Sequence, residues 1–202
     1  SHKPASKFAA TDLFVADESD NSDGEEPKWR TTFPVDFAID NWATQNGSDK
    51  HVSSRLIQGK YLRANGTNAV SSESAYQFDY MNGFYADSGA TSGMYAWMFR
   101  RAKGFFDVAT YTGNATSGRT VAHNLGVVPE LMIVKMRDGA YNWTVYTPAL
   151  GNTKAIFLNL TNSPQTNTGY WNDTTPTSSV FTVGDVAQVN DNNKDFIAYL
   201  FA

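Results

Sequence analysis

The sequence predicts an all-β fold made of two tandem antiparallel β-sandwich units, and three observations lead to this prediction. Apolar residues alternate with polar ones, or form short blocks, between clusters of Gly, Asn, Asp and Pro, which is the pattern of strands and turns. No stretch has the length and the period of an amphipathic helix. The two halves carry similar motifs in the same order, which indicates an internal repeat of a jelly-roll or concanavalin-like unit.

The expected strands are short and follow one another with turn residues between them. In the first half they cover residues 12–16, 35–39, 60–63, 76–80 and 94–100. In the second half they cover residues 107–111, 130–135, 142–146, 155–160, 180–183 and 196–201. Many short strands without a long helix are typical of sandwiches.

Four segments of the first half align with segments of the second half. Ala96 aligns with Ala198 inside two aromatic strands, and Pro34 aligns with Pro129. The other two matches join residues 59–68 to 153–162 and residues 78–84 to 181–187. The offsets drift slightly, as expected if loops changed length between two related copies. We therefore expect one sandwich at residues 8–102 and a second at 105–202, with a very short linker.

Composition excludes several classes of function. Charged residues make up 18% of the 202 residues and the formal net charge is −4, so there is no basic stripe that could follow nucleic-acid phosphates. No apolar stretch approaches the roughly 20 residues that span a bilayer. The sequence contains no cysteine, which excludes disulfides, thiolate zinc sites and cysteine nucleophiles. We expect neither a nucleic-acid partner nor membrane insertion.

A series of motifs in the second half resembles a known module. The motifs are Tyr111-Thr112-Gly113-Asn114, Gly118-Arg119, His123-Asn124-Leu125-Gly126, Pro129-Glu130-Leu131, Val134-Lys135, Trp143, Val145-Tyr146 and Tyr199-Leu200-Phe201-Ala202. They resemble a module of structural proteins in tailed bacteriophages, especially marine and cyanobacterial phages. The resemblance is specific over roughly residues 96–202 and weaker before them, where such proteins often carry a concanavalin-like or laminin-G-like sandwich.

The resemblance implies a virion protein of a tail fibre or another adsorption appendage, and it implies no catalytic residues. One position departs from the pattern, because Ala115 stands where a second glycine is usual. We expect the turn at this position to differ from that of the resembled module.

The repeat divides the aromatic residues into two groups. Large residues at equivalent positions are expected in the cores, since two cores of the same shape need the same side chains. These pairs are Trp97 with Tyr199, Phe99 with Phe201, and Trp42 with Trp143. Tyr141, Tyr170 and Trp171 have no counterpart and lie beside Asn, Asp and Gly, so they are the candidates for stacking on a glycan ring. Capping a sandwich or meeting another subunit are the alternatives for these three rings.

Two oxygen-rich stretches raise the question of calcium binding. Within residues 17–26, Ser19, Asn21 and Asp23 match ligand positions of an EF-hand loop, but Arg30 occupies the place of its closing Glu. Residues 190–195 precede the last strand, where a hairpin turn is required. We expect solvated turns in both places, with calcium as the alternative, and no metal site or cofactor.

No catalytic constellation is recognisable in the sequence. His2, His51 and His123 are scattered, and no serine lies in a nucleophile elbow. We expect the His123 imidazole to bond the backbone of its own turn. A carboxylate pair for glycoside hydrolysis stays open, because its separation is a property of the folded chain. The candidate carboxylates are Asp36, Asp79, Asp87, Asp138 and Asp185.

These observations favour a non-enzymatic virion protein that contributes to attachment to a host surface. We expect a homo-oligomer, most simply a trimer, whose partners are other virion proteins and a host-surface glycan or protein. Several copies on one virion would multiply weak contacts. The alternatives are a polysaccharide depolymerase and a purely structural spacer or capsid-decorating protein.

Overall fold

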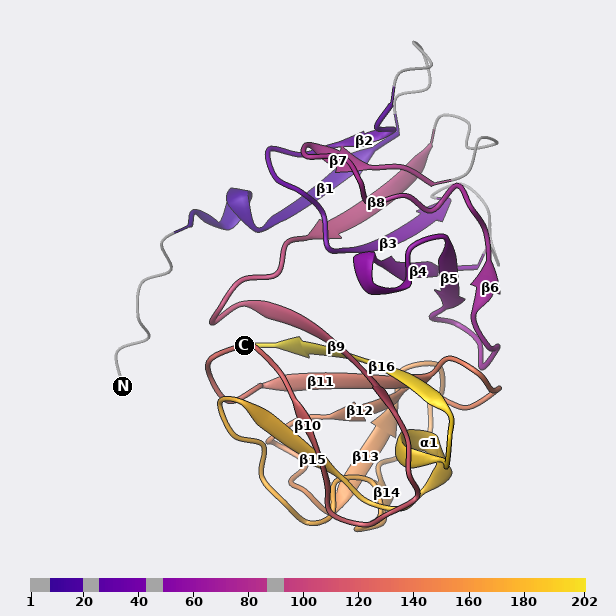
Figure 1. The fold of residues 1–202 in the computed structure, drawn as a ribbon, viewed down its shortest axis with the longest axis vertical. Helices are drawn as coiled ribbons and strands as arrows, with labels where there is room; N and C mark the ends of the chain where they lie inside the picture. Colours follow the sequence, from indigo (N-terminus) through magenta and orange to yellow (C-terminus); the bar gives the residue numbers. More distant parts are fainter. Residues whose placement is uncertain (1–7, 20–25, 43–48, 87–92) are drawn as a thin grey trace. The chain divides into compact units, whose positions relative to one another are not determined.

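The computed structural model describes residues 8–19, 26–42, 49–86 and 93–202, apart from the side chain of Trp42. The chain divides into two units. The first unit consists of Ser1–Tyr61 and Ser71–Arg101, and the second consists of Leu62–Val70 and Ala102–Ala202. The strands of both units are labelled in Figure 1.

The first unit contains a six-stranded sheet and a two-stranded sheet. The larger sheet has the order β1-β8-β3-β4-β5-β6, and the smaller pairs β2 with β7. The strands are β1 (Phe14–Glu18), β2 (Trp29–Arg30), β3 (Phe37–Trp42), β4 (His51–Ser54), β5 (Lys60–Arg63), β6 (Ser71–Ser72), β7 (Gly83–Phe84) and β8 (Met94–Phe99). The last two residues of β5, Leu62 and Arg63, fall in the second unit. Two short 3-10 helices, η1 (Ala10–Asp12) and η2 (Arg55–Ile57), precede β1 and β5.

The second unit has the same two kinds of sheet. Its six-stranded sheet has the order β14-β13-β12-β11-β16-β9, and its two-stranded sheet pairs β10 with β15. The strands are β9 (Phe106–Thr112), β10 (Arg119–Ala122), β11 (Leu131–Met136), β12 (Thr144–Tyr146), β13 (Lys154–Phe157), β14 (Gln165–Thr166), β15 (Val180–Val183) and β16 (Asp195–Phe201). A single turn of helix, α1 (Ala187–Asn190), precedes β16.

The strand order repeats from one unit to the other. Counted from the first strand of each unit, the larger sheet reads 1-8-3-4-5-6 and the smaller reads 2-7 in both. The ladders are antiparallel. The predicted all-β class with two antiparallel sandwich units is therefore confirmed, and so is the repeat that relates them.

The register of the last strand fixes which residues are equivalent. Phe99 of β8 lies opposite Phe14 and Phe37, and Phe201 of β16 lies opposite Phe106 and Leu131. The predicted alignment of Ala96 with Ala198 follows the same register, since each stands three residues before its phenylalanine.

The core of each unit lies between its larger and smaller sheets. In the first unit, Trp29 and Phe84 of the smaller sheet pack with the inward residues of β8, which are Met94, Ala96 and Met98. Each large apolar side chain that leaves water contributes roughly 1.5–3 kcal/mol.

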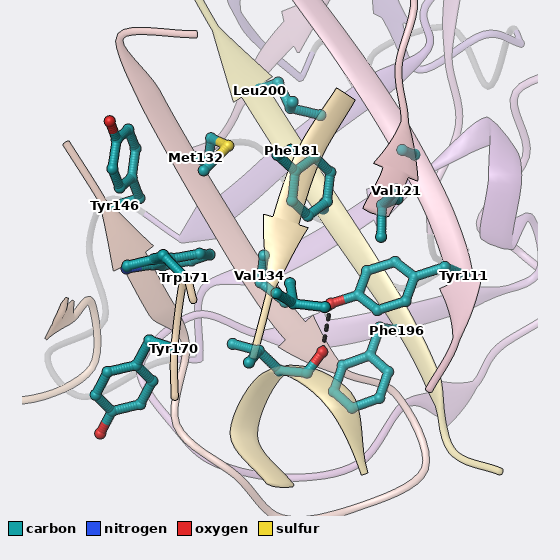
Figure 2. Packing of buried hydrophobic residues seen from close by; sticks show 14 of the residues in the cluster. Tyr111, Val121, Met132, Val134, Tyr146, Tyr170, Trp171, Phe181, Phe196 and Leu200 are labelled. Carbon is teal, nitrogen blue, oxygen red and sulfur yellow. Dashed lines mark hydrogen bonds between the residues drawn. The ribbon is translucent and has the colours of Figure 1, made fainter. Parts of the chain in front are cut away.

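The core of the second unit is built on the equivalent positions. Phe196, Ala198 and Leu200 of β16 pack with Val121 and Phe181 of the smaller sheet, and Figure 2 shows most of this cluster. The inward positions of β8 and β16 therefore carry the same alternation of large and small side chains, which is why the repeat is visible in the sequence.

Three details of the predicted alignment and strands are corrected by the structure. The match through Pro34 and Pro129 is off by one residue, because the register pairs Phe37 with Leu131 as equivalents. The match of residues 78–84 with 181–187 is wrong, since β7 and β15 are the equivalent strands and it does not superimpose them.

Residues 76–80 do not form the predicted strand. Gln77 makes only an isolated bridge to Tyr85, although Tyr76 and Phe78 are both buried. The alternation in this stretch therefore records burial in the core and not pairing with a neighbouring strand.

Candidate functional site

The outer side of the larger sheet in the first unit exposes aromatic side chains. On β8, Met94, Ala96 and Met98 point into the core, so the alternation of a strand directs Tyr95 and Trp97 to the opposite side. Trp97 is 53% exposed and Tyr95 is 40% exposed. A tryptophan held half-exposed on a sheet offers a flat apolar surface, which is the kind of feature that marks binding sites.

Three neighbouring strands contribute to this surface in two rows. Ala16, Trp97 and Ile39 lie side by side in the first row, and Glu18 lies opposite Tyr95 in the second. We call these five residues the open face. The Tyr95 hydroxyl donates a hydrogen bond to Glu18 Oε2 at 3.0 Å, and this bond, together with the Glu18 charge, raises the pKa of Tyr95.

The open face continues into a row of phenylalanines. The Phe99 ring lies between those of Phe14 and Phe37, with centroids 4.7 Å and 5.4 Å away. Phe14 is 37% exposed and Phe37 is 3% exposed, so the row is open at its Phe14 end. The surface can therefore hold an apolar partner by contact, and its single ordered polar pair, Tyr95 with Glu18, can orient that partner.

The expectation that Trp97 is a core residue is wrong. Its equivalence to Tyr199 holds, because the two residues stand two positions before Phe99 and Phe201, but Trp97 is exposed and Tyr199 is buried. On β8 of the first unit, the side that meets the smaller sheet is core, whereas the other side of the sheet is buried only at neighbouring positions such as Phe37 and Val52. Phe99 and Phe201 are both half-buried.

The expected pairing of Trp42 with Trp143 is also wrong. Trp42 lies opposite Met94, and Met136 lies opposite the equivalent Phe196, so Met136 is the counterpart of Trp42. Trp143 itself is 1% exposed, as predicted for a core residue, while the side chain of Trp42 is outside the described part of the chain.

Two of the three predicted glycan-stacking rings lie inside the second core. Trp171 and Tyr170 are 1% and 6% exposed, and Figure 2 shows both rings within the cluster. The Trp171 indole also donates to the backbone oxygen of Lys154 at 3.0 Å. The prediction is wrong for these two, because a loop rich in turn residues packs its aromatic rings inward. Tyr141 is half-buried against the same core, and its contact with a glycan stays a prediction.

The side chains of Asn190 and Asp195, at the two ends of residues 190–195, are engaged in protein contacts. The Asn190 side chain is fully buried and bonds three backbone groups. One Asp195 oxygen accepts from Arg137 at 2.7 Å and the other from Thr112 at 2.8 Å. Among the described residues, no group of three or more His, Asp or Glu side chains could hold a metal ion.

Most of the stretch at 17–26 lies outside the described residues, since 20–25 are not described. Of the remainder, Asp17 accepts a hydrogen bond from the Arg30 backbone at 3.1 Å.

Most of the candidate carboxylates have structural partners. Asp36 pairs with Arg55 at 3.2 Å and accepts from the Arg101 backbone at 2.8 Å. Asp79 accepts from Gln58 at 2.7 Å, and Asp138 accepts from the backbone of Asp195 at 2.7 Å. Asp185 lies in a turn after β15, and Asp87 lies outside the described residues.

The structure brings together one polar cluster that sequence reasoning missed. Asp40 on β3 lies opposite His51 on β4, and the Tyr76 hydroxyl is 2.6 Å from His51 Nδ1 and 3.3 Å from Asp40 Oδ2. Burial raises the pKa of Asp40, against the opposing effect of His51. Asp40 and His51 face each other because of the register between β3 and β4. The spacing of these residues along the chain does not reveal that register.

His123 has the structural role that the sequence predicts. Its Nδ1 accepts the backbone N–H of Leu125 at 3.2 Å, which places the ring proton on Nε2, 3.2 Å from the backbone oxygen of Thr177. Burial lowers the pKa of His123. The imidazole therefore joins its own turn to the segment before β15.

The first unit also has an open hollow of about 430 Å³ beside β1 and β2. Its lining residues are Thr11, Asp12, Val15, Arg30, Thr31 and Thr32. It contains no aromatic ring, and the Asp12 carboxylate already accepts from the Ala9 backbone at 3.0 Å.

Within the described residues, no helix is both long and apolar enough to cross a membrane.

Comparison with known proteins identifies one family. The model of a family described as "Domain of unknown function (DUF7483)" matches residues 86–202, which is more than half of the chain. No curated protein and no solved structure matches the chain.

Proposed function

The chain belongs to the DUF7483 family, and we propose that it is a non-enzymatic structural protein of a bacteriophage tail fibre or similar appendage. In this proposal the protein is part of the virion, forms a homo-oligomer such as a trimer, and contributes to attachment to the host surface. Its other partners are neighbouring virion proteins and a glycan or protein of the host.

The observation that carries the proposal concerns the described residues: the motifs have structural roles, and the exposed aromatic side chains lie on a sheet. The motifs that resemble phage modules build the second unit: Tyr111 donates to the Val189 backbone at 2.6 Å, and His123 joins two loops. The largest exposed aromatic side chain, Trp97, lies on a sheet, and the one carboxylate of the open face, Glu18, accepts a hydrogen bond from Tyr95. Such an arrangement favours binding and assembly over bond breaking.

Attachment through many copies suits a chain of this kind. Weak contacts at each copy add up when several copies are displayed on one particle, because each later contact is effectively intramolecular. The low share of charged residues, 18% of the chain, also suits repeated, reversible contact with a polar surface.

The proposal is tested by locating the protein and by competing for adsorption. Antibodies against the purified chain should label the tail region of a phage that encodes it, in negative-stain micrographs with gold conjugates. The purified chain at saturating concentration should slow adsorption of that phage to its host. Labelling of the capsid, or normal adsorption despite bound chain, contradicts the proposal.

Two further measurements separate the alternatives. Release of reducing ends from host polysaccharide by the purified chain would identify a depolymerase. A glycan array tests for a spacer, which should bind nothing at high loading. On such an array Tyr141→Ala should weaken any glycan signal, whereas Tyr170→Phe should leave it unchanged, because the Tyr170 ring is buried.

A further inference from the structure

Equivalent positions on the last strand of the two units differ in solvent exposure. Trp97 and Tyr199 occupy equivalent places on β8 and β16, yet Trp97 is 53% exposed and Tyr199 is 1% exposed. Their neighbours follow the same trend, since Tyr95 is 40% exposed and the equivalent Ile197 is buried. This side of the last strand is therefore covered in the second unit and open in the first, although Phe37 and Val52, on the same side of the first unit's sheet, are buried.

A loop of the chain contacts the covered face of the second unit at Trp143. Tyr199 stacks with Trp143, with ring centroids 6.2 Å apart. The Trp143 indole N–H donates to the backbone oxygens of Arg63 and Gly66 at 2.9 Å and 3.1 Å. Further along this loop, the Val70 N–H donates to the backbone oxygen of Arg137 at 2.8 Å. The loop is Leu62–Val70, which is part of the second unit.

The second unit carries an equivalent loop that is exposed. Lys60 pairs with Ser72 across β5 and β6, and Lys154 pairs with Thr166 across β13 and β14. The number of residues between the paired positions is therefore the same in both hairpins. We call residues 158–164 the repeat loop.

The two loops also begin with the same turn. The Gly66 N–H bonds the Arg63 oxygen at 3.3 Å, and the Leu160 N–H bonds the Phe157 oxygen at 3.2 Å. The carbonyl groups that receive the Trp143 indole thus have counterparts at Phe157 and Leu160.

The repeat loop is more apolar than the loop that covers Trp143. Leucine stands at 158 and 160, where the first hairpin has Ala64 and Gly66. Leu158 and Leu160 are 51% and 43% exposed. Two exposed leucines at the tip of a hairpin are apolar area that association would remove from water.

We propose that the repeat loop of one copy of this protein docks on the open face of a second copy. Leu158 and Leu160 would pack against Trp97, and the Trp97 indole N–H is the donor available to the carbonyl groups of the loop. The occupant is a second copy because the loop that contacts this face at Trp143, in the unit where the face is covered, is the equivalent hairpin loop of the same repeat. This inference rests on the repeat and does not depend on the phage assignment.

The contact joins different surfaces of the two copies, so it has a defined geometry. Such a head-to-tail contact leaves one free loop and one free open face on every dimer, and it generates a closed ring or an open filament according to the rotation between copies. A chain that associates this way is a building element of an assembly.

The experiment uses the full chain and measures mass by sedimentation over a wide concentration range. We expect wild type to form dimers and larger species as concentration rises. Trp97→Glu and the double variant Leu158→Glu/Leu160→Glu should each weaken association by about tenfold or more, the effect of losing a central apolar contact. Met81→Glu is the matched control, since Met81 is 74% exposed and belongs to neither surface.

Mixing the two variants gives the sharpest test. The Trp97→Glu copy keeps its loop and the loop variant keeps its open face, so the mixture should form a dimer that cannot grow further. Far-UV circular dichroism and thermal melting check that each variant is folded, and Trp97→Ser replaces Trp97→Glu if the charged variant is not.

Several results would overturn the proposal. Wild type that stays monomeric at all concentrations shows that the docking does not occur. An oligomer that resists both variants uses another surface. Sensitivity to Trp97→Glu without sensitivity to the loop variant indicates a symmetric contact between open faces, and glycan binding at Trp97 by a monomer assigns the face to a different ligand.

Discussion

The ammonium group of Lys135 donates a hydrogen bond to the backbone oxygen of Gly139 at 3.1 Å, in a place where the lysine has no exposed surface. A second bond, at 2.6 Å, goes to the backbone oxygen of Met136. Two carbonyl groups compensate the buried charge only in part, and burial lowers the pKa of Lys135 to about 8.

Stability should therefore increase with pH between about 8 and the ordinary lysine pKa near 10.4. In this range the folded chain loses the Lys135 proton while the unfolded chain keeps it, so the unfolded state binds more protons. The gain is at most about 3 kcal/mol, since one pKa unit corresponds to about 1.4 kcal/mol.

Urea denaturation of wild type and Lys135→Met between pH 7.5 and 9.5 checks this expectation. The variant cannot titrate at this position, so its free energy of unfolding should stay flatter. The range stops below pH 10 because burial raises the pKa of Tyr111 and of Tyr199, which has the opposite effect at higher pH. Parallel curves for the two proteins would contradict the predicted role of Lys135.

Protonation of His123 should make the folding stability depend on pH on the acidic side of neutrality. Burial lowers the pKa of His123, so its contribution to stability is present above the unfolded value near 6.5 and is lost as pH falls through the folded value. Protonation also removes the Nδ1 acceptor of the Leu125 N–H. We expect the melting temperature of wild type to fall below about pH 6.5 more steeply than that of His123→Asn.

The asparagine variant is suited to this comparison because its side-chain oxygen can take the place of Nδ1 without titrating. Thermal melting at several pH values between 5 and 8 gives the difference between the two proteins, which cancels the contribution of the carboxylates they share. A difference that does not change with pH would show that His123 stays neutral or contributes nothing.

The repeat and the core positions were accessible from sequence because the inward side chains of each strand must match a core of fixed shape. Met94, Ala96 and Met98 on β8, with their counterparts on β16, give an alternation that survives changes in loop length. The same periodicity cannot say whether the other side of a strand is covered. Tyr95 and Trp97 are aromatic and exposed, because whether a side chain is covered depends on what packs against the strand and not on the strand itself.

The buried aromatic residues of the loops show a second limit of prediction from the sequence. Tyr170 and Trp171 lie among turn residues, and the turn chemistry there is real, since Asn172 and Asp173 have positive φ angles. Local composition, however, describes the backbone of a loop and not the direction in which its large side chains point. The Asp40–Tyr76–His51 cluster was not predicted for a related reason, because it depends on the register between β3 and β4 and on the more distant segment of Tyr76.

Asn190 should be among the most sensitive polar residues of the second unit. Its amide donates to the backbone oxygens of Thr116 and Gly184 at 2.9 Å and 2.7 Å, and its oxygen accepts from the Asn114 N–H at 2.9 Å. Asn190→Ala leaves these groups without their buried partner, which costs about 3 kcal/mol.

The matched control is Asn192→Ala, two positions along the same turn, where the residue is exposed. This change should lie within about 0.5 kcal/mol of wild type. Chemical denaturation of both variants measures the difference, and equal stability of the two would show that Asn190 is dispensable.

Ala115 stands where the resembled phage modules carry a second glycine, and its backbone has a φ of 53°. This left-handed conformation costs a residue with a Cβ atom roughly 1–2 kcal/mol and costs glycine almost nothing. Because glycine also makes the unfolded chain more flexible, we expect Ala115→Gly to stabilise the protein by about 0.5–1 kcal/mol.

The control for this change is Ala122→Gly. Ala122 is exposed on β10, where the extended backbone gives glycine no advantage, so this variant should be destabilised by about 0.5–1 kcal/mol. Opposite signs for the two substitutions, measured by chemical denaturation under one condition, would attribute the effect to the left-handed backbone at Ala115. A loss of stability in both would mean that the turn holds its shape through the hydrogen bond from the Ala115 N–H to the Asn190 backbone oxygen, at 2.8 Å, and gains nothing from the glycine that the resembled modules use.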